Sequence, residues 1–211
     1  MATEIKSWEI VDGQLREVSG SLADQGRLER QDLEAWIASN PEILGSDIAI
    51  IGRQVATRSG PLDLLGIDKN GNTVVIELKR DRLPREALSQ AIDYASDISQ
   101  WSMDKLSEIT SKNTDKSLED FLSETFEDIS LENVTINQAQ RILLVGFSVD
   151  DSLERMISWL SDNFGVNINA VVLHYTKTES GSELLTRTFI IPEEVEKERV
   201  RTKKFNNTDV R

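Results

Sequence analysis

The sequence predicts an α/β domain whose central mixed β-sheet is flanked by helices. Three observations support this prediction. Three strand-like segments separated by short turns follow one another between residues 48 and 79. An amphipathic helix comes next, at residues 84–101, and a continuous apolar run at residues 141–147 is typical of a central strand that is buried on both faces.

The elements before the sheet are a hairpin and a helix. Residues 4–18 carry Asp12-Gly13, a strong two-residue turn signal, between two short segments with spaced apolar residues. We expect a helix at residues 27–39, because four apolar residues stand near helical spacing, namely Leu28, Leu33, Trp36 and Ile37. Pro41 ends this helix, since the residue before a proline disfavours the α conformation.

Three consecutive strands begin the sheet. Residues 48–57 form the first strand, residues 62–68 the second, and residues 73–79 the third, which is the richest in β-branched residues. The turns at residues 59–61 and 69–72 contain glycine next to proline or asparagine. Turns this short make each strand the antiparallel neighbour of the next.

The rest of the chain alternates helices with strands. We expect a helix at 84–101 opening at Pro84, polar helices and a loop at 101–135, a buried strand at 141–147, a helix at 149–164, and strands at 168–175 and 184–191. The 211 residues suffice for one domain with a full core. We divide the chain into an N-terminal hairpin extension, a main domain and a charged C-terminal tail, at residues 1–26, 27–191 and 192–211.

The charge of the chain is strongly negative and unevenly distributed. A formal net charge of −13 argues against broad wrapping of a nucleic acid, whose phosphates are normally held by basic patches. Residues 51–90 nevertheless carry a net charge of +2, whereas residues 101–135 carry −6. The chain therefore allows a small enzyme footprint on DNA around residues 53–85.

Composition excludes several other classes of protein. Without cysteine there is no disulfide, thiolate metal ligand or cysteine nucleophile, which agrees with a reducing, cytoplasmic location. No window approaches eighteen apolar residues, and the N-terminus lacks a basic region followed by an apolar stretch, so we expect neither a membrane span nor a secretory signal. The only histidine, His174, is expected to be a hydrogen-bonded core residue rather than a general base.

The residues that carry chemistry are two acids and a lysine on the second and third strands. Glu77 and Lys79 are two positions apart and therefore share a face, and Asp63 lies on the adjacent strand. Two converging carboxylates repel each other unless a cation lies between them, and hard oxygen ligands, with the carbonyl of Leu78 as a further one, suit Mg²⁺ or Mn²⁺. Lys79 can hold or deprotonate a water, or stabilise charge on a phosphate. Together these groups are what phosphodiester hydrolysis requires.

A solvated strand face is the usual explanation of a Glu-x-Lys pair. Here the pair interrupts an otherwise apolar strand, and Asp63 stands between Leu62 and Leu64. Charges placed in an apolar sheet cost several kcal/mol unless they are paired or bind a metal. The pattern therefore favours the catalytic interpretation.

The segment GPLDLLGIDKNGNTVVIELKR resembles the PD-(D/E)XK nuclease signature, with Pro61 displaced by one position. Gln90 and Tyr94 match the Q-x-x-x-Y element of the RecB-like branch, in which the glutamine lies near the active site. Over about residues 28–101 the chain is similar to the C-terminal catalytic domain of NucS (EndoMS) endonucleases. The resemblance implies a restriction-endonuclease-like core (αβββαβ) and metal-dependent cleavage of DNA. It also implies that an acid on the helix before the sheet, here Glu34, joins the metal site.

The candidate site residues follow from these patterns. We expect catalytic roles for Asp63, Glu77, Lys79 and Gln90, and metal ligands from Glu34, Asp63, Glu77 and Leu78. We expect contacts with nucleic acid from Tyr94 and from five arginines around the motif, namely Arg53, Arg58, Arg80, Arg82 and Arg85. Plainer explanations stay open for some of them: an exposed helix position for Glu34, core packing for Tyr94 and simple solvation for the arginines.

Two other functional classes remain as alternatives. One is a binding module for nucleic acid or protein that keeps the fold without turnover, which the net charge of −13 favours. The other is an interaction subunit that docks through the acidic residues 101–135. The expected partner is DNA, and a homodimer or an accessory DNA-binding protein could supply specificity. The motif itself does not encode which DNA is cut, or whether the role is in repair or in restriction.

Overall fold

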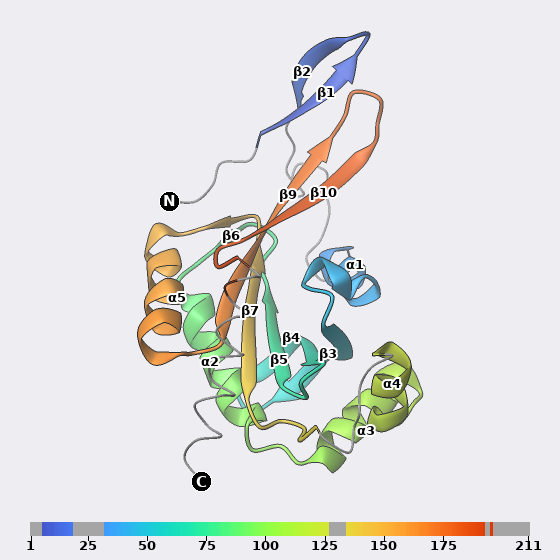
Figure 1. Ribbon diagram of the computed structural model, residues 1–211, viewed down its shortest axis with the longest axis vertical. Helices are drawn as coiled ribbons and strands as arrows, with labels where there is room; N and C mark the ends of the chain where they lie inside the picture. The colour runs from blue at the N-terminus through green and yellow to red at the C-terminus, as the bar shows by residue number, and fades with distance from the viewer. Residues whose placement is uncertain (1–5, 19–31, 127–133, 193–194, 196–211) are drawn as a thin grey trace.

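A computed structural model describes residues 6–18, 32–126, 134–192 and 195. Its centre is a six-stranded mixed sheet in the order β10-β9-β7-β5-β4-β3, with helices on both faces (Figure 1). The predicted mixed α/β architecture is confirmed.

One half of the sheet is the antiparallel succession expected from the sequence. β3 (Ile48–Thr57), β4 (Gly60–Asp68) and β5 (Thr73–Leu78) pair with one another in chain order. Every residue of β5 is buried, as its β-branched sequence predicts for a central strand. The β3–β4 register shifts between Ile50 and Gly52, which marks a β-bulge in β3.

The other half of the sheet mixes parallel and antiparallel pairs. β7 (Gln140–Gly146) lies parallel to β5, and β9 (Ile168–Lys177) lies parallel to β7. β10 (Glu183–Phe189) pairs antiparallel with β9 and forms an edge. A separate parallel pair of two-residue strands, β6 (Arg82–Leu83) and β8 (Ser148–Val149), was not expected, because two residues are too few to produce a periodic pattern.

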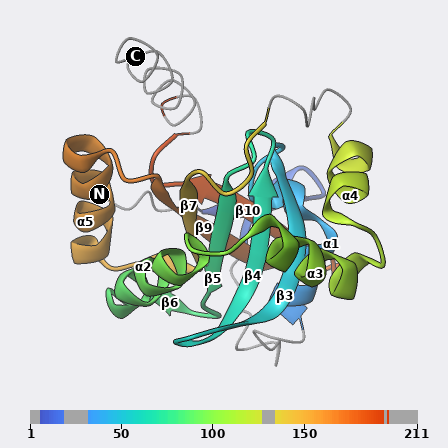
Figure 2. The ribbon, with the colours of Figure 1, turned by 90° about the horizontal axis from the view of Figure 1, so that it is seen from below.

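Helices cover the two faces of the sheet unequally. One hydrophobic core takes side chains from four helices and one face of the sheet, and Figure 2 shows α2 and α3 on that same side. The second core lies on the opposite face under the short helix α1 (Glu34–Ser39) and the 3₁₀ turn η2 (Pro41–Ile43). The four helices of the first core are α2 (Glu86–Ile98), α3 (Met103–Thr114), α4 (Leu118–Thr125) and α5 (Asp151–Phe164).

The N-terminal hairpin is confirmed as β1 (Ser7–Val11) and β2 (Gln14–Val18). Its turn residues have positive φ, 51° at Asp12 and 76° at Gly13, as a two-residue hairpin turn requires. Figure 1 shows it beside the projecting end of β9 and β10, where Arg16 forms an ion pair of 2.5 Å with Glu179.

Some boundaries differ from the expected ones. The described part of the first helix is α1, six residues long, while residues 27–31 of the expected helix lie outside the described residues. α2 ends at Ile98 instead of residue 101, because the side-chain amide of Asn137 donates to the carbonyls of Ile98 and Trp101 at 2.8 and 3.0 Å and caps that end.

Three further expectations concern the acidic region, the tail and the membrane. The polar helices expected within 101–135 are α3 and α4, and the expected loop falls largely on residues 127–133, outside the described residues. Nearly all of the tail at 192–211 also lies outside them. Within the described ranges, every helix is too short or too polar to cross a membrane.

Candidate active site

The candidate site lies at a fork where β4 and β5 separate. Their antiparallel pairing runs from Ile67 opposite Thr73 to Leu64 opposite Ile76 and ends there. One step further along the same register, Asp63 stands opposite Glu77. The carboxylate of Asp63 accepts from the backbone N–H of Leu78, the residue after Glu77, so the structure brings Asp63 next to the segment of β5 that carries Glu77.

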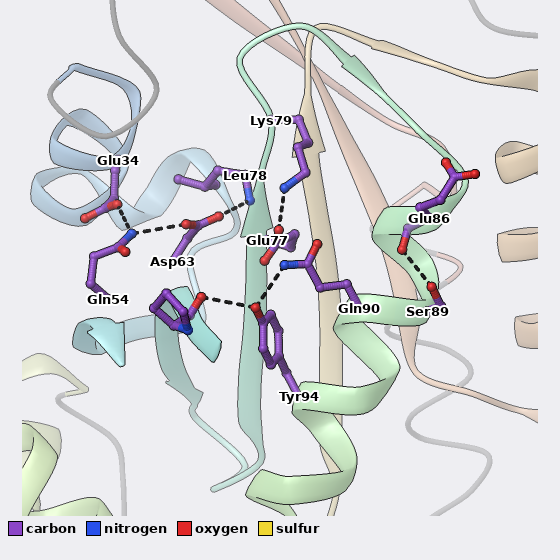
Figure 3. Close-up of polar contacts among 11 residues, drawn as sticks. Glu34, Gln54, Asp63, Glu77, Leu78, Lys79, Glu86, Ser89, Gln90 and Tyr94 are labelled. Carbon is purple, nitrogen blue, oxygen red and sulfur yellow. Dashed lines mark hydrogen bonds and ion pairs between the residues drawn. The ribbon is translucent and has the colours of Figure 1, made fainter. Parts of the chain in front are cut away.

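Asp63 bridges the two strands after they separate (Figure 3). Its Oδ2 accepts a hydrogen bond of 2.9 Å from the backbone N–H of Leu78, which thereby gains a partner beyond the end of the ladder. The N–H and C=O of one strand residue point to the same side. The Leu78 carbonyl is therefore also directed to the β4 side of the fork, the position expected of a backbone metal ligand.

Glu77 and Lys79 form a close ion pair on the face of β5 that is directed toward α2. Lys79 Nζ lies 2.5 Å from Glu77 Oε1, and the Glu77 side chain is 2% exposed. Lys79 is 28% exposed, so its ammonium connects a buried carboxylate to the opening of the fork. A buried carboxylate needs such a partner, because an uncompensated charge there is strongly destabilising.

Glu34 comes to the same place from the opposite side. It is the first residue of α1 and is 2% exposed, so the explanation of Glu34 as an ordinary exposed helix residue is wrong. Its Oε1 accepts 3.0 Å from Arg53 Nε, and its Oε2 accepts 2.6 Å from Gln54 Nε2. Helix α1 thus delivers a third acid to the fork.

Gln54 is the site residue that the sequence did not indicate. Its side-chain amide bonds both Glu34 and Asp63, the second at 3.1 Å from Nε2 to Asp63 Oδ1. Its backbone has φ 46°, a left-handed conformation that non-glycine residues seldom adopt and that costs about 1–3 kcal/mol. A glutamine within a strand looks ordinary in a sequence. The one available signal is Gly52 nearby, because glycine inside a strand often marks a bulge.

Gln90 and Tyr94 link helix α2 to the site. Gln90 Nε2 donates to the Tyr94 hydroxyl at 2.9 Å, and that hydroxyl donates to the Pro61 carbonyl at 3.1 Å. The expectation that Tyr94 contacts nucleic acid is corrected, because its ring is 2% exposed and packs in the core. Tyr94 instead fastens the β3–β4 hairpin to α2, and Gln90 stands exposed on the helix surface.

The five arginines proposed to contact DNA are spread more widely than the acids. Arg53 belongs to the acidic cluster at the fork, because it donates to Glu34. The others pair with acids of their own, at 3.3 Å for Arg58 with Asp97, 3.7 Å for Arg80 with Asp81, 2.8 Å for Arg82 with Asp150 and 3.2 Å for Arg85 with Glu86. Three of these four side chains are more than half exposed, which leaves them accessible to a phosphate.

The only histidine lies outside this cluster. His174 is on β9, which β7 separates from β5 in the sheet. It is half-buried, and its Nε2 atom is buried without a hydrogen-bond partner within the described part of the chain. It was expected to be a hydrogen-bonded core residue, and this expectation is wrong for Nε2.

The cluster contains the types of ligand that bind a divalent cation. Asp63, Glu77 and Glu34 supply carboxylate oxygens and Leu78 a carbonyl, the hard ligands that Mg²⁺ and Mn²⁺ prefer. As the side chains stand, however, no three acidic or histidine groups of the described ranges converge closely enough to hold an ion. Gln54 contributes to this, because its amide lies between Glu34 and Asp63.

Residues 29–139, which contain all of these acids, match the family described as the endonuclease NucS C-terminal domain. The chain belongs to this family. The match includes Glu34, Gln54 and Lys79, and it runs beyond the motif through α3 and α4.

Members of the NucS family give shorter matches. Endonuclease NucS of Aeropyrum pernix is 40% identical over 67 residues, which cover 31% of this chain and 26% of that protein. Endonuclease NucS of Pyrococcus abyssi is 36% identical over 81 residues, or 38% of this chain and 29% of that protein. These matches thus span little more than a quarter of the relatives' length. A crystal structure of a repair endonuclease from P. abyssi has a TM-score of 0.38 and 20% identity, covering 67% of this chain and 46% of that one.

Proposed function

We propose that this chain is a metal-dependent DNA endonuclease of the PD-(D/E)XK type that hydrolyses phosphodiester bonds in repair or restriction. The observation that carries the proposal is the convergence of Asp63, Glu77 and Lys79 at one fork between β4 and β5. Membership of the NucS C-terminal domain family supports it, as do relatives that are named endonucleases.

Glu34, Asp63, Glu77 and the Leu78 carbonyl would together hold Mg²⁺ or Mn²⁺. Such an ion, when bound, lowers the pKa of a water and stabilises negative charge on a phosphate. Asp63 is held for this role by the Leu78 N–H, and Glu34 by Arg53. These hydrogen bonds hold the two acids at the fork, and the acids would still have to close around an ion.

Lys79 is the residue that would act on the reacting groups. Its ammonium lies between the buried Glu77 and the opening of the fork, where it can orient an attacking water or stabilise the charge that develops on a phosphate oxygen. Gln90, exposed on α2 and bonded to Tyr94, can orient a water or a phosphate oxygen from the same side as Lys79. DNA would reach the fork across the exposed arginines at positions 58, 82 and 85.

A cleavage assay tests this proposal. The chain is incubated with plasmid, mismatched duplex and single-stranded DNA in Mn²⁺, Mg²⁺ or EDTA. We expect metal-dependent cleavage of at least one substrate, and a loss of about 10²-fold or more in Lys79→Met, since removing one transition-state donor has an effect of that size. Lys112→Met is the matched control, because Lys112 is an exposed lysine that pairs with Glu108 on α3.

The assay also decides between the enzyme and a binding module. The net charge of −13 and the pairing of Glu34 with Arg53 and of Glu77 with Lys79 are what a module without turnover would also show. Binding of DNA without cleavage in any metal would overturn the nuclease proposal and support the module.

A further inference from the structure

We infer that Gln54 is a placeholder for the metal: its amide holds Glu34 and Asp63 together in the metal-free protein and must leave when the ion binds. This inference rests on the proposed function, because it concerns the same carboxylates. It assigns to Gln54 a role in setting the metal affinity, as a positioning residue and not as a group that touches the substrate.

The side-chain amide of Gln54 is shared between two carboxylates. A glutamine NH₂ group has two hydrogens. Here the nitrogen lies 2.6 Å from Glu34 Oε2 and 3.1 Å from Asp63 Oδ1, so one donor atom serves two different carboxylates (Figure 3). A dipole with its positive end between two negative groups does what a cation would do there, only more weakly.

The Gln54 amide occupies the space between Glu34 and Asp63. An ion bound by both carboxylates would lie about 2.1 Å from an oxygen of each. Gln54 Nε2 stands in that space, and the oxygens cannot close around an ion while it remains. The two occupants therefore exclude each other, and the hydrogen bonds of Gln54 compete directly with the ion.

The backbone of Gln54 is strained, with φ 46°. Its neighbours on both sides remain in the β3–β4 register, Arg53 opposite Leu64 and Val55 opposite Leu62, so the distortion is confined to one residue. Strain of this kind persists only when surrounding contacts hold it in place. An ion that binds the two carboxylates also removes the hydrogen bonds that hold Gln54. The Gln54 side chain can then move away through a change at that one residue.

The other partners of the acids would stay in place after that change. Arg53 would still hold Glu34 through Oε1, and the Leu78 N–H would still hold Asp63 through Oδ2. Removing Gln54 should therefore not disorder the acids, and it removes their competitor. We expect Gln54→Gly, which suits a positive φ, to bind Mn²⁺ about tenfold more tightly than the wild type, since two hydrogen bonds to charged groups no longer have to be broken.

Calorimetric titration with Mn²⁺ tests the inference on four proteins. These are the wild type, Gln54→Gly, Gln54→Ala as a second variant that keeps a Cβ atom, and Gln100→Gly as a control at an exposed glutamine. Thermal unfolding in EDTA and in Mn²⁺ gives an independent readout, in which both Gln54 variants should show a larger metal-induced rise in Tm than the wild type and the control.

The outcomes separate this inference from the proposed function. Tighter binding in the Gln54 variants supports it, including the case in which only the variants bind detectably. Equal or weaker binding in the variants, with clear binding by the wild type, would overturn the placeholder and leave the metal site standing. Absence of binding in the wild type and in both variants would overturn the metal site itself, and the placeholder with it.

Discussion

Glu77 and Asp63 are both held at the fork, but by different contacts. Glu77 is buried and neutralised by Lys79, whereas Asp63 is half-buried and is held by the Leu78 backbone and Gln54. The sequence predicts that these acids approach each other, because strand parity and a short turn are enough to show it. It could not predict that Gln54 belongs to the site, because a single residue with positive φ produces no periodic pattern in the sequence.

At the residue scale, replacing Glu77 tests the ligand set. Glu77→Gln keeps the size of the side chain but removes its negative charge, so we expect Mn²⁺ to bind at least about tenfold more weakly in calorimetry, as a carboxylate ligand is far better for a hard cation than an amide. Glu108→Gln, a change of the same kind at an exposed acid that pairs with Lys112, should leave the affinity unchanged. Equal affinities in all three proteins would remove Glu77 from the ligand set.

At the scale of elements, the site depends on how α2 holds the β3–β4 hairpin. Tyr94 makes the connection through the Pro61 carbonyl, and Asp97, one turn further along α2, accepts from the backbone N–H of Arg58 at 2.9 Å. The sequence predicts α2, β4 and β5 because they are long and periodic. It could not predict the two-residue pair β6–β8, nor the end of α2, which a side chain 39 residues away in sequence caps.

Removing the Tyr94 hydroxyl tests this connection. Tyr94→Phe keeps the buried ring but loses the hydrogen bonds to Pro61 and Gln90, so we expect the free energy of unfolding to fall by about 1 kcal/mol in urea titrations. Met or Leu at this position would also change the packing and would be less informative. A Tyr94→Phe protein as stable as the wild type would show that the Pro61 contact does not stabilise the fold.

The β4–β5 turn begins at a buried acid, Asp68, whose contribution to the stability of the fold depends on pH. Burial raises the pKa of the Asp68 carboxyl above its ordinary value of 3.8, although bonds from Asn72 and Asn70 oppose the shift. Because this pKa is higher in the folded than in the unfolded chain, the folded state binds the proton more tightly. The contribution of Asp68 to stability is therefore most favourable below about pH 3.8 and is lost as the pH rises through the raised value.

Urea unfolding of the wild type and Asp68→Asn between pH 4 and 7 checks this effect, with pH values chosen to start near the ordinary pKa of about 4. The variant cannot ionise, and its oxygen can still accept from the backbone N–H groups of Asn70 and Asn72. We expect the wild type to lose stability relative to the variant as the pH rises. A difference that stays constant, or grows in favour of the wild type, would contradict the assignment.

On the scale of the whole molecule, the distribution of charge limits how DNA could bind under the proposed function. The net charge of −13 repels a polyanion, so the proposed DNA binding depends on a few exposed cations near the fork. Counting the charged residues along the sequence predicts this group of basic residues. It does not predict which acids they pair with. In the structure Arg82 bonds Asp150, whose carboxyl has a pKa lowered by hydrogen bonds from Ser152 and also by Arg82.

Arg82→Ala should therefore weaken DNA binding only moderately, since a phosphate must compete with Asp150 for the guanidinium. We expect the dissociation constant, measured by fluorescence anisotropy in EDTA, to rise several-fold at low salt and the slope of log K against log salt to decrease by roughly 1. Lys112→Ala, on acidic α3, removes the same charge and should change neither quantity. An unchanged slope in Arg82→Ala would place DNA elsewhere on the surface.

A crystal structure of the chain soaked in Mn²⁺, with anomalous data to locate the ion, tests most directly whether the fork between β4 and β5 is a metal site. We predict an Mn²⁺ ion about 2.1 Å from oxygens of Glu34, Asp63, Glu77 and the Leu78 carbonyl, with the amide of Gln54 no longer between Glu34 and Asp63. An ordered fork without Mn²⁺, or an ion bound without Asp63 and Glu77, would contradict it.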